Sequence, residues 1–204
     1  MQTESIPGPA GALQVLVERP EAQARALAVI CHPHPLHGGS LSNKIVHQLA
    51  RTFVDMGAVS VRFNFRGVGE SSGEYDEGRG ELEDLLAVID WASQHWPGLS
   101  LWLGGFSFGG FIAIQAAAKL DPQQLVTVAP AVNYFPQQSV DLRDTDWLLI
   151  QGDSDDVVPL SNVQAWEQQQ PVPPVVRVIG GAGHFFHGRL NELKQAILDH
   201  YLKT

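Results

Sequence analysis

A serine between two glycines is the pattern in this chain with the clearest chemical use. Residues 105–109 read Gly-Phe-Ser-Phe-Gly, with an apolar, strand-like run before Ser107 and an apolar, alanine-rich, helix-like run after it. A serine on a sharp strand-to-helix turn forms a nucleophile elbow, in which glycines allow the close backbone approach that a strained serine needs. We therefore expect Ser107 to act as a nucleophile in acyl transfer.

The same pattern occurs again at residues 69–73, in different surroundings. Ser71 is followed by the polar, turn-like residues 74–78, and no apolar helix begins at this serine. The sequence therefore predicts that Ser71 is an ordinary loop serine.

A serine hydroxyl needs a base to remove its proton and a carboxylate to orient that base. On a parallel sheet the reacting groups gather at the carboxyl ends of the strands. The acid is therefore expected in the loop after the strand-like residues 147–151. That loop contains Asp153, Asp155 and Asp156, and the pattern alone leaves all of them open.

The base is expected after the last strand-like segment, residues 175–179. Glycines come directly before His184 in that loop, so the chain can bend and the imidazole can reach across the strand ends. The chain order serine, aspartate, histidine is also the order found with a nucleophile elbow. We predict His184 as the base, with His187 as the lesser candidate.

Acyl transfer also requires backbone N–H groups directed at the developing oxyanion. The residue after the nucleophile, Phe108, supplies one of them. The second is expected in the loop that follows the strand-like residues 26–31. Pro33 and Pro35 have no N–H to donate there, so His34 between them is the candidate.

The same loop permits another chemistry, because His32, His34 and His37 resemble the zinc-ligand run of the metallo-β-lactamases. Leu36 stands where that run has an aspartate, and the prolines restrict the rings. We expect no metal and no other cofactor, and a metal-dependent hydrolase remains the alternative. A non-catalytic binding protein on the same fold is a further alternative.

The elements that must position these residues alternate along the chain. Apolar, β-rich segments are expected at residues 13–18, 26–31, 59–65, 99–105, 125–129, 147–151 and 175–179. Helical patterns are expected at about residues 42–56, 80–96, 107–120, 160–169 and 188–202. Such alternation predicts βαβ units on a mostly parallel sheet with helices on both faces. The first two strands are joined by a short connection and are expected to pair antiparallel at one edge.

Other notable residues are expected to be structural. Glu81, Glu83 and Asp84 fall in the first turn of a helix, where carboxylates suit the helix dipole and are expected to be solvated. Arg66 is expected to brace a turn. Cys31, the single cysteine, lies in an apolar run and is expected to be a small core residue.

Length and composition limit the classes of protein. With 204 residues and 44% hydrophobic content, the chain is expected to form one domain over residues 1–204. No apolar run approaches a membrane span, and the first residues lack a secretory signal, so a cytoplasmic protein is expected. The net charge of −9 disfavours nucleic acid and anionic membranes as partners. The edge strands give no clear signal of oligomeric state.

Together the motifs resemble the α/β-hydrolase fold superfamily over nearly the whole chain. The resemblance rests on the turn around Ser107, the stretch 152–159 and the pair Gly183 and His184. The His-Pro-His-Pro loop is similar to that of a group of small, lidless bacterial serine hydrolases. The resemblance implies that Asp155 is the acid, because the family's Gly-x-x-Asp-x-x-Val-Pro pattern aligns on residues 152–159. It also implies His184 as the base.

Many members of this superfamily carry a cap between two late strands, but only residues 130–146 are available here. That segment is too short for a covering domain, so we expect no cap domain. Nearby aromatic side chains could line an apolar acyl pocket: Phe106, Tyr134, Phe135 and Phe185, with Phe108 and Phe186 as further candidates. The expected function is hydrolysis of small or accessible carboxylic esters through an acyl-serine intermediate, with a small-molecule ester as the partner.

Overall fold

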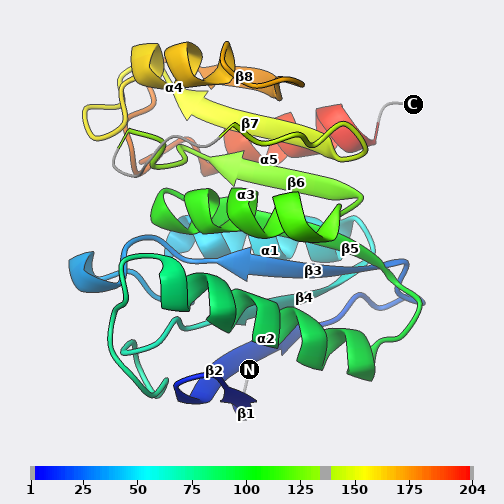
Figure 1. Ribbon diagram of the computed structural model, residues 1–204. Helices are drawn as coiled ribbons and strands as arrows, with labels where there is room; N and C mark the ends of the chain where they lie inside the picture. The colour runs from blue at the N-terminus through cyan, green and yellow to red at the C-terminus, as the bar shows by residue number, and fades with distance from the viewer. Residues whose placement is uncertain (1–2, 134–138, 203–204) are drawn as a thin grey trace.

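A mostly parallel sheet forms the centre of the molecule. The computed structural model describes residues 3–133 and 139–202, and within them eight strands form one sheet in the order β1-β2-β4-β3-β5-β6-β7-β8 (Figure 1). The strands are β1 (Glu4–Gly8), β2 (Gly11–Glu18), β3 (Ala26–Cys31), β4 (Ala58–Phe63), β5 (Ser100–Phe106), β6 (Gln124–Val128), β7 (Asp146–Gly152) and β8 (Val175–Ile179). Strands β3 to β8 are parallel, β2 pairs antiparallel with β4, and β1 pairs antiparallel with β2.

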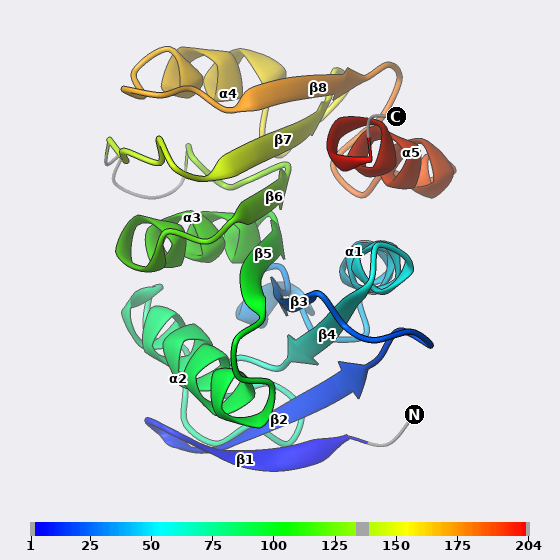
Figure 2. The ribbon, with the colours of Figure 1, turned by 90° about the vertical axis from the view of Figure 1, so that its right-hand side faces the viewer.

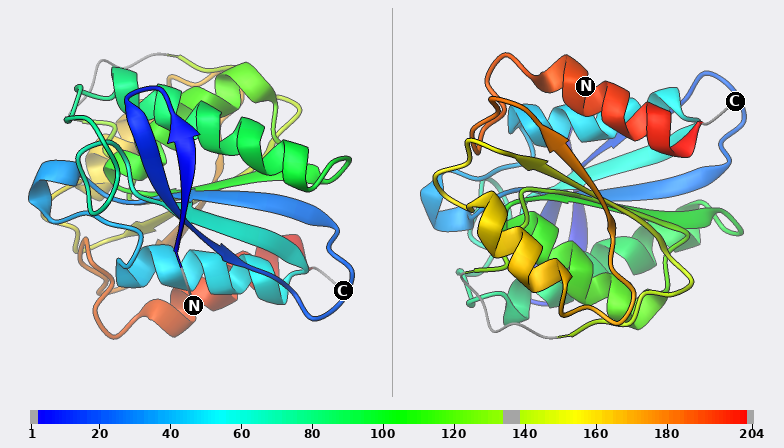
Figure 3. Two further views of the ribbon diagram at one scale, coloured as in Figure 1. Left: turned by 90° about the horizontal axis from the view of Figure 1, so that it is seen from below. Right: turned by 90° about the horizontal axis from the view of Figure 1, so that it is seen from above.

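Helices cover both faces of this sheet. They are α1 (Lys44–Asp55), α2 (Arg79–His95), α3 (Phe108–Leu120), α4 (Leu160–Glu167) and α5 (Leu190–Tyr201), with a short 3₁₀ helix η1 (Pro35–His37). α1 and α5 lie on one face, and α2, α3 and α4 lie on the other (Figures 2 and 3). Each face has its own buried core, with Leu49 and Ile197 in one and Val88 and Ile112 in the other. The expected sheet and helix arrangement is confirmed.

Strand β3 lies where the order of the strands reverses. All its residues are buried, as expected for a strand covered on both faces. The chain passes from β3 through α1 to β4 on one side, and then returns through α2 to β5 on the other side. Because α1 and α2 cover opposite faces, a crevice opens at the carboxyl ends of β3 and β5. The residue that follows β5 is Ser107.

The expected pairing of the first two predicted strands is wrong. β2 does not pair with β3, because both edges of β3 are occupied by the parallel strands β4 and β5. β2 therefore pairs with β4, and a strand that the sequence did not indicate, β1, pairs with β2. β1 is short, contains Pro7 and buries Ile6 alone among its apolar side chains, so it has no clear alternation pattern.

The acidic start of α2 is also different from the expectation, because Glu81 and Asp84 are buried rather than solvated. Asp84 accepts hydrogen bonds from the Arg66 guanidinium, at 2.8 Å from Nη2, and from the Arg66 N–H. Glu81 accepts the N–H groups of Asp76 and Gly78 and so caps the helix. Arg66 therefore ties the turn after β4 to α2, the bracing role that was expected for it.

The helices of the described residues are all too short or too polar to cross a membrane.

Candidate active site

Ser107 occupies a strained turn between β5 and α3. Its φ of 54° and ψ of −118° are uncommon for a residue with a side chain, and such strain typically costs on the order of 1–3 kcal/mol. The flanking glycines make the turn possible. A Cβ on Gly105 would lie 2.2 Å from the Gly109 oxygen, and one on Gly109 would lie 2.4 Å from the His32 oxygen. The start of α3 is therefore in close backbone contact with the loop after β3.

A continuous hydrogen-bonded chain joins Ser107, His184 and Asp155. The Ser107 Oγ lies 3.0 Å from His184 Nε2, and His184 Nδ1 lies 2.8 Å from Asp155 Oδ2. All three residues are buried. With a proton on Nδ1 donated to the carboxylate, Nε2 is left to accept the serine hydroxyl proton. This arrangement can activate a serine for attack on a carbonyl carbon.

The Asp155 carboxylate is held by several donors besides His184. Its Oδ1 accepts the N–H groups of Val157 and Val158 at 2.9 and 2.7 Å. Burial alone would raise the pKa of Asp155, but the hydrogen bonds from His184, Val158 and Val157 outweigh it and hold the pKa below its ordinary value. The carboxylate is therefore ionised at neutral pH and can orient the imidazole.

Sequence reasoning missed Gln151, which also binds this carboxylate. Its side chain is fully buried at the end of β7, and Nε2 donates to Asp155 Oδ2 at 3.0 Å and to the Val158 oxygen at 2.8 Å. The available signal was a polar residue at the end of the apolar run Leu-Leu-Ile-Gln-Gly. A glutamine inside an otherwise apolar strand needs a polar partner when it is buried.

The structure separates the aspartates that the sequence left open. Asp153 is exposed and accepts the Gly181 N–H at 2.7 Å, which orders the loop that leads to His184, and Asp156 is also exposed. Gly152 lies so close to that loop that a Cβ would be 2.1 Å from the Ala182 oxygen. Only Asp155 among these residues faces the imidazole.

The other sequence candidates lie away from this chain of hydrogen bonds. His187 is exposed, and its ring centroid lies 5.9 Å from that of Phe185. Ser71 is buried in the turn after β4, where its Oγ donates to the Asn64 oxygen and accepts the Gln14 N–H. Ser71 therefore fastens a loop to β2, as expected for a structural serine.

The structure places the loop with His34 beside the start of α3. The rings of His34 and Phe108 have centroids 5.2 Å apart, and Phe108 is the first residue of α3. Among residues 3–133 and 139–202, none accepts the His34 N–H. The N-terminus of α3 also carries the positive end of the helix dipole. The two N–H groups could therefore serve one developing negative charge.

The three histidines of this loop do not converge on one point. His32 is fully buried, its Nδ1–H donates to the Pro33 oxygen at 2.6 Å, and its Nε2 accepts the Phe65 N–H at 3.0 Å. Burial lowers the pKa of His32 to about 4, so the ring is neutral at pH 7. Within the described part of the chain, no group of His, Cys, Asp and Glu side chains is arranged to hold a metal ion. The alternative of a histidine-bound metal therefore has no geometric support.

The proposed aromatic pocket needs a correction at Phe106. This side chain is fully buried in the core, and its ring centroid lies 5.0 Å from that of His184. It packs against the imidazole and has no exposed surface to offer a substrate. Phe185 is 52% exposed beside His184 and remains available to substrate, whereas the rings of Phe108 and Phe186 are buried. Tyr134 and Phe135 lie outside the described residues.

Known proteins resemble this chain in sequence and in fold. Residues 11–135 match the X-Pro dipeptidyl-peptidase (S15) family, a range that includes His34 and Ser107. An uncharacterized protein of Rickettsia prowazekii (strain Madrid E) is 33% identical over 96% of this chain and 86% of its own length.

Two solved structures superpose on nearly the whole chain. An alpha-beta serine hydrolase homologue from Coxiella burnetii is 44% identical, with a TM-score of 0.93 over 98% of this chain and 97% of its own. An α/β serine hydrolase without a lid from Xanthomonas campestris is 38% identical, with a TM-score of 0.94 over 99% of this chain and 94% of its own.

Proposed function

The chain belongs to the X-Pro dipeptidyl-peptidase (S15) family and to the lidless α/β serine hydrolases, and from this premise we propose that it hydrolyses small or accessible carboxylic esters. The observation that carries the proposal is the hydrogen-bonded chain from Ser107 through His184 to Asp155. An ester is a less demanding acyl substrate for such a chain than an amide, because an alkoxide leaves more readily than an amide anion.

In the first step the Ser107 Oγ attacks the ester carbonyl carbon, and His184 Nε2 takes the hydroxyl proton. The carbonyl π electrons move to oxygen and give a tetrahedral oxyanion. The Phe108 N–H, and the His34 N–H with it, stabilise that charge. Asp155 stays ionised and stabilises the imidazolium through Nδ1. The carbon–oxygen bond to the alcohol then breaks, and the leaving oxygen takes the proton from His184.

A water molecule completes the cycle by attacking the acyl-serine. His184 removes a proton from that water and returns it to Ser107 Oγ as the second tetrahedral intermediate collapses. The products are an alcohol and a carboxylic acid, and Ser107 is regenerated.

The family match favours a second candidate, cleavage after an X-Pro dipeptide. The same residues could perform it, with His184 protonating the leaving nitrogen of an amide instead of the leaving oxygen of an ester. Rates on alanyl-proline p-nitroanilide and on p-nitrophenyl acetate separate the two. A kcat/KM on the dipeptide amide that equals or exceeds that on the ester would replace the ester proposal by the peptidase one.

The ester proposal is tested by steady-state hydrolysis of p-nitrophenyl acetate. We expect Ser107→Ala and His184→Ala each to lower kcat by about a thousandfold or more, because the groups act as a unit. Ser71→Ala is the matched control, since it removes the serine of the second Gly-x-Ser-x-Gly stretch and should leave kcat within about twofold. Activity that survives in Ser107→Ala would contradict the proposal.

A further inference from the structure

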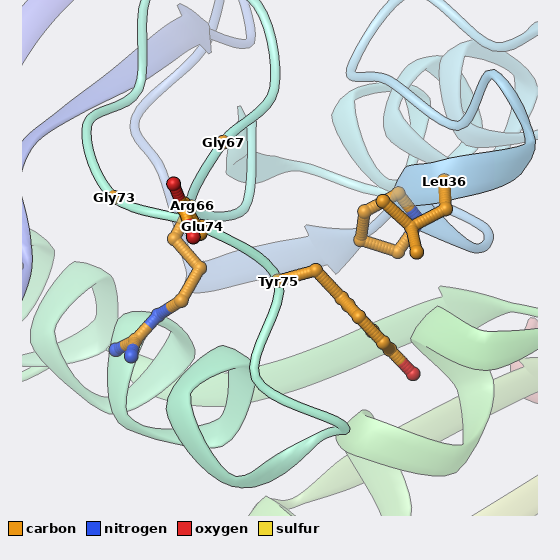
Figure 4. Close-up of a pocket in the computed structure, with 7 residues that line it drawn as sticks. Leu36, Arg66, Gly67, Gly73, Glu74 and Tyr75 are labelled. Carbon is orange, nitrogen blue, oxygen red and sulfur yellow. The ribbon is translucent and has the colours of Figure 1, made fainter.

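A groove lies next to the loop that carries His34. It has a volume of about 380 Å³ and is formed by the η1 turn on one side and by the segment after β4 on the other (Figure 4). Its lining includes Pro35 and Leu36 from the first and Glu74 and Tyr75 from the second. A space of this size can hold a group of several carbon atoms.

The groove lies on the opposite side of Ser107 from His184. Its walls follow β3 and β4, Ser107 follows β5, and His184 follows β8 at the far edge of the sheet. The strands that lead to its walls, β3 and β4, are therefore the first and second neighbours of β5 on the side away from β8. Tyr75 also packs on His34, with ring centroids 4.9 Å apart.

This placement separates the two halves of an ester. His184 must protonate the leaving oxygen, so the alcohol part lies on the His184 side, near the exposed Phe185. The oxyanion faces the N–H groups of Phe108 and His34. The acyl part is then directed away from His184, toward the ends of β3 and β4.

The charges around the groove restrict what it can hold. Arg66 contributes to its lining, but the guanidinium points away from Leu36 and Tyr75 and is bound to Asp84 and Glu83 (Figure 4). Glu74 is exposed at the groove and carries a negative charge. Burial, together with the carboxylates of Glu81 and Glu77, raises the pKa of Tyr75, so its hydroxyl stays neutral. The local charge therefore disfavours an anion.

Leu36 gives the groove an apolar wall that the fold does not need. Its side chain is 68% exposed on the η1 turn, beside the Tyr75 ring that also lines the groove. The turn itself is held by other contacts, since the His34 oxygen accepts the N–H groups of His37 and Gly39. An apolar acyl chain would remove both Leu36 and the Tyr75 ring from water.

We propose that this groove binds the distal part of the acyl group and selects uncharged or cationic apolar acyl chains over anionic ones. The inference rests on the proposed ester hydrolysis and names the acyl class that this site takes. Leu36 and Glu74 are its specificity-determining residues, Leu36 by apolar contact and Glu74 by charge.

The test compares p-nitrophenyl esters of acetic acid, of phenylbutyric acid and of adipic acid with its far carboxylate free. We expect kcat/KM to be about tenfold higher on the phenylbutyrate ester than on either the acetate ester or the adipate ester. Leu36→Ser should lower kcat/KM on the phenylbutyrate ester by about fivefold and leave kcat/KM on the acetate ester unchanged. Glu74→Lys should raise kcat/KM on the adipate ester relative to kcat/KM on the phenylbutyrate ester.

Leu120→Ser is the matched control, because Leu120 is also partly exposed but lies at the far end of α3. This variant should leave the ratios of kcat/KM among the three esters unchanged. If Ser107-dependent hydrolysis of the acetate ester is present but Leu36→Ser affects all esters equally, the groove assignment is wrong and the proposed function stands. If no ester is hydrolysed, both are wrong.

Discussion

Ser107, His184 and Asp155 each depend on neighbours that hold them in position. Phe106 packs against the imidazole, and the Val157 and Val158 N–H groups hold one oxygen of the carboxylate. Gln151 holds the other oxygen from inside β7. The imidazole thus has a fixed orientation before any substrate arrives, which is the condition for efficient proton transfer.

Gln151 should act as a positioning residue for Asp155. Gln151→Leu keeps the size of the side chain and removes the hydrogen bonds to Asp155 and to the Val158 oxygen. We expect kcat on p-nitrophenyl acetate to fall about tenfold with KM nearly unchanged, since a hydrogen bond to a charged group contributes about 1.5–3 kcal/mol. Steady-state kinetics on the folded variant provide the measurement.

Gln124→Leu is the control for this substitution. Gln124 is the first residue of β6, so it lies at the amino ends of the strands, away from the active site at their carboxyl ends. The variant should leave both constants unchanged. A Gln151→Leu variant in which KM rises while kcat is preserved would show that Gln151 does not act through Asp155.

At this scale the sequence predicted the serine and the histidine, because each stands next to glycines after an apolar strand. The aspartate was chosen among its neighbours only through the resemblance to a known family. Gln151 was missed although its partners Asp155 and Val158 are near in sequence, because a single polar residue at a strand end does not show what it binds. The burial of Asp84 could not be predicted, since it depends on Arg66, a partner distant in sequence. Asp84 meets Arg66 only after the turn after β4 packs on α2.

The loop between β3 and α1 is the element that matters most for the oxyanion. It is fastened to β4 and to the residues directly after it at two places. The Phe65 N–H binds His32 Nε2, and Leu41 is held by the Asn64 carboxamide and by the Arg62 guanidinium. All of these contacts are buried, so the loop that carries His34 is anchored on both sides of that residue.

His32 should make stability depend on pH. Its folded pKa of about 4 is below its ordinary value of 6.5, so between these values the unfolded chain binds a proton that the folded chain does not. The stabilisation is present above pH 6.5 and is lost as pH falls toward 4. From about pH 7 to about pH 5 this contributes a loss of about 2 kcal/mol in the free energy of unfolding.

Urea unfolding at about pH 7 and about pH 5 measures this loss, and His32→Gln provides the comparison. Glutamine can still accept the Phe65 N–H but does not titrate. We expect the variant to lose about 2 kcal/mol less than the parent over the same interval, because the carboxylates titrate alike in both. Equal losses in the two proteins would mean that His32 is not the group responsible.

The strand and helix positions were largely predictable, because β3 to β8 are apolar and alternate with amphipathic helices. The pairing of the first strands was not. Connection length suggested that β2 joins β3, but the crossovers through α1 and α2 place parallel strands on both edges of β3. β1 was invisible because a short edge strand with Pro7 needs little apolar pattern.

At the scale of the whole molecule, the reversal of strand order at β3 explains why residues from several loops meet in one crevice. The loop after β3 brings His34, the elbow after β5 brings Ser107, and the loops after β7 and β8 bring Asp155 and His184. In Figure 1 these loops all lie at the carboxyl ends of the parallel strands, on the left-hand side. The short segment over residues 130–146 leaves room for no covering domain, in accord with the lidless relative.

The most direct test of the central claim is labelling of the folded protein with a fluorophosphonate, followed by mass spectrometry of its peptides. An activated serine is phosphonylated, whereas an ordinary serine is not. We predict a single adduct, located on Ser107, that is absent in Ser107→Ala, strongly slowed in His184→Ala and unchanged in Ser71→Ala. A folded protein that takes up no label, or an adduct that persists in Ser107→Ala, would contradict the assignment and favour a non-catalytic role.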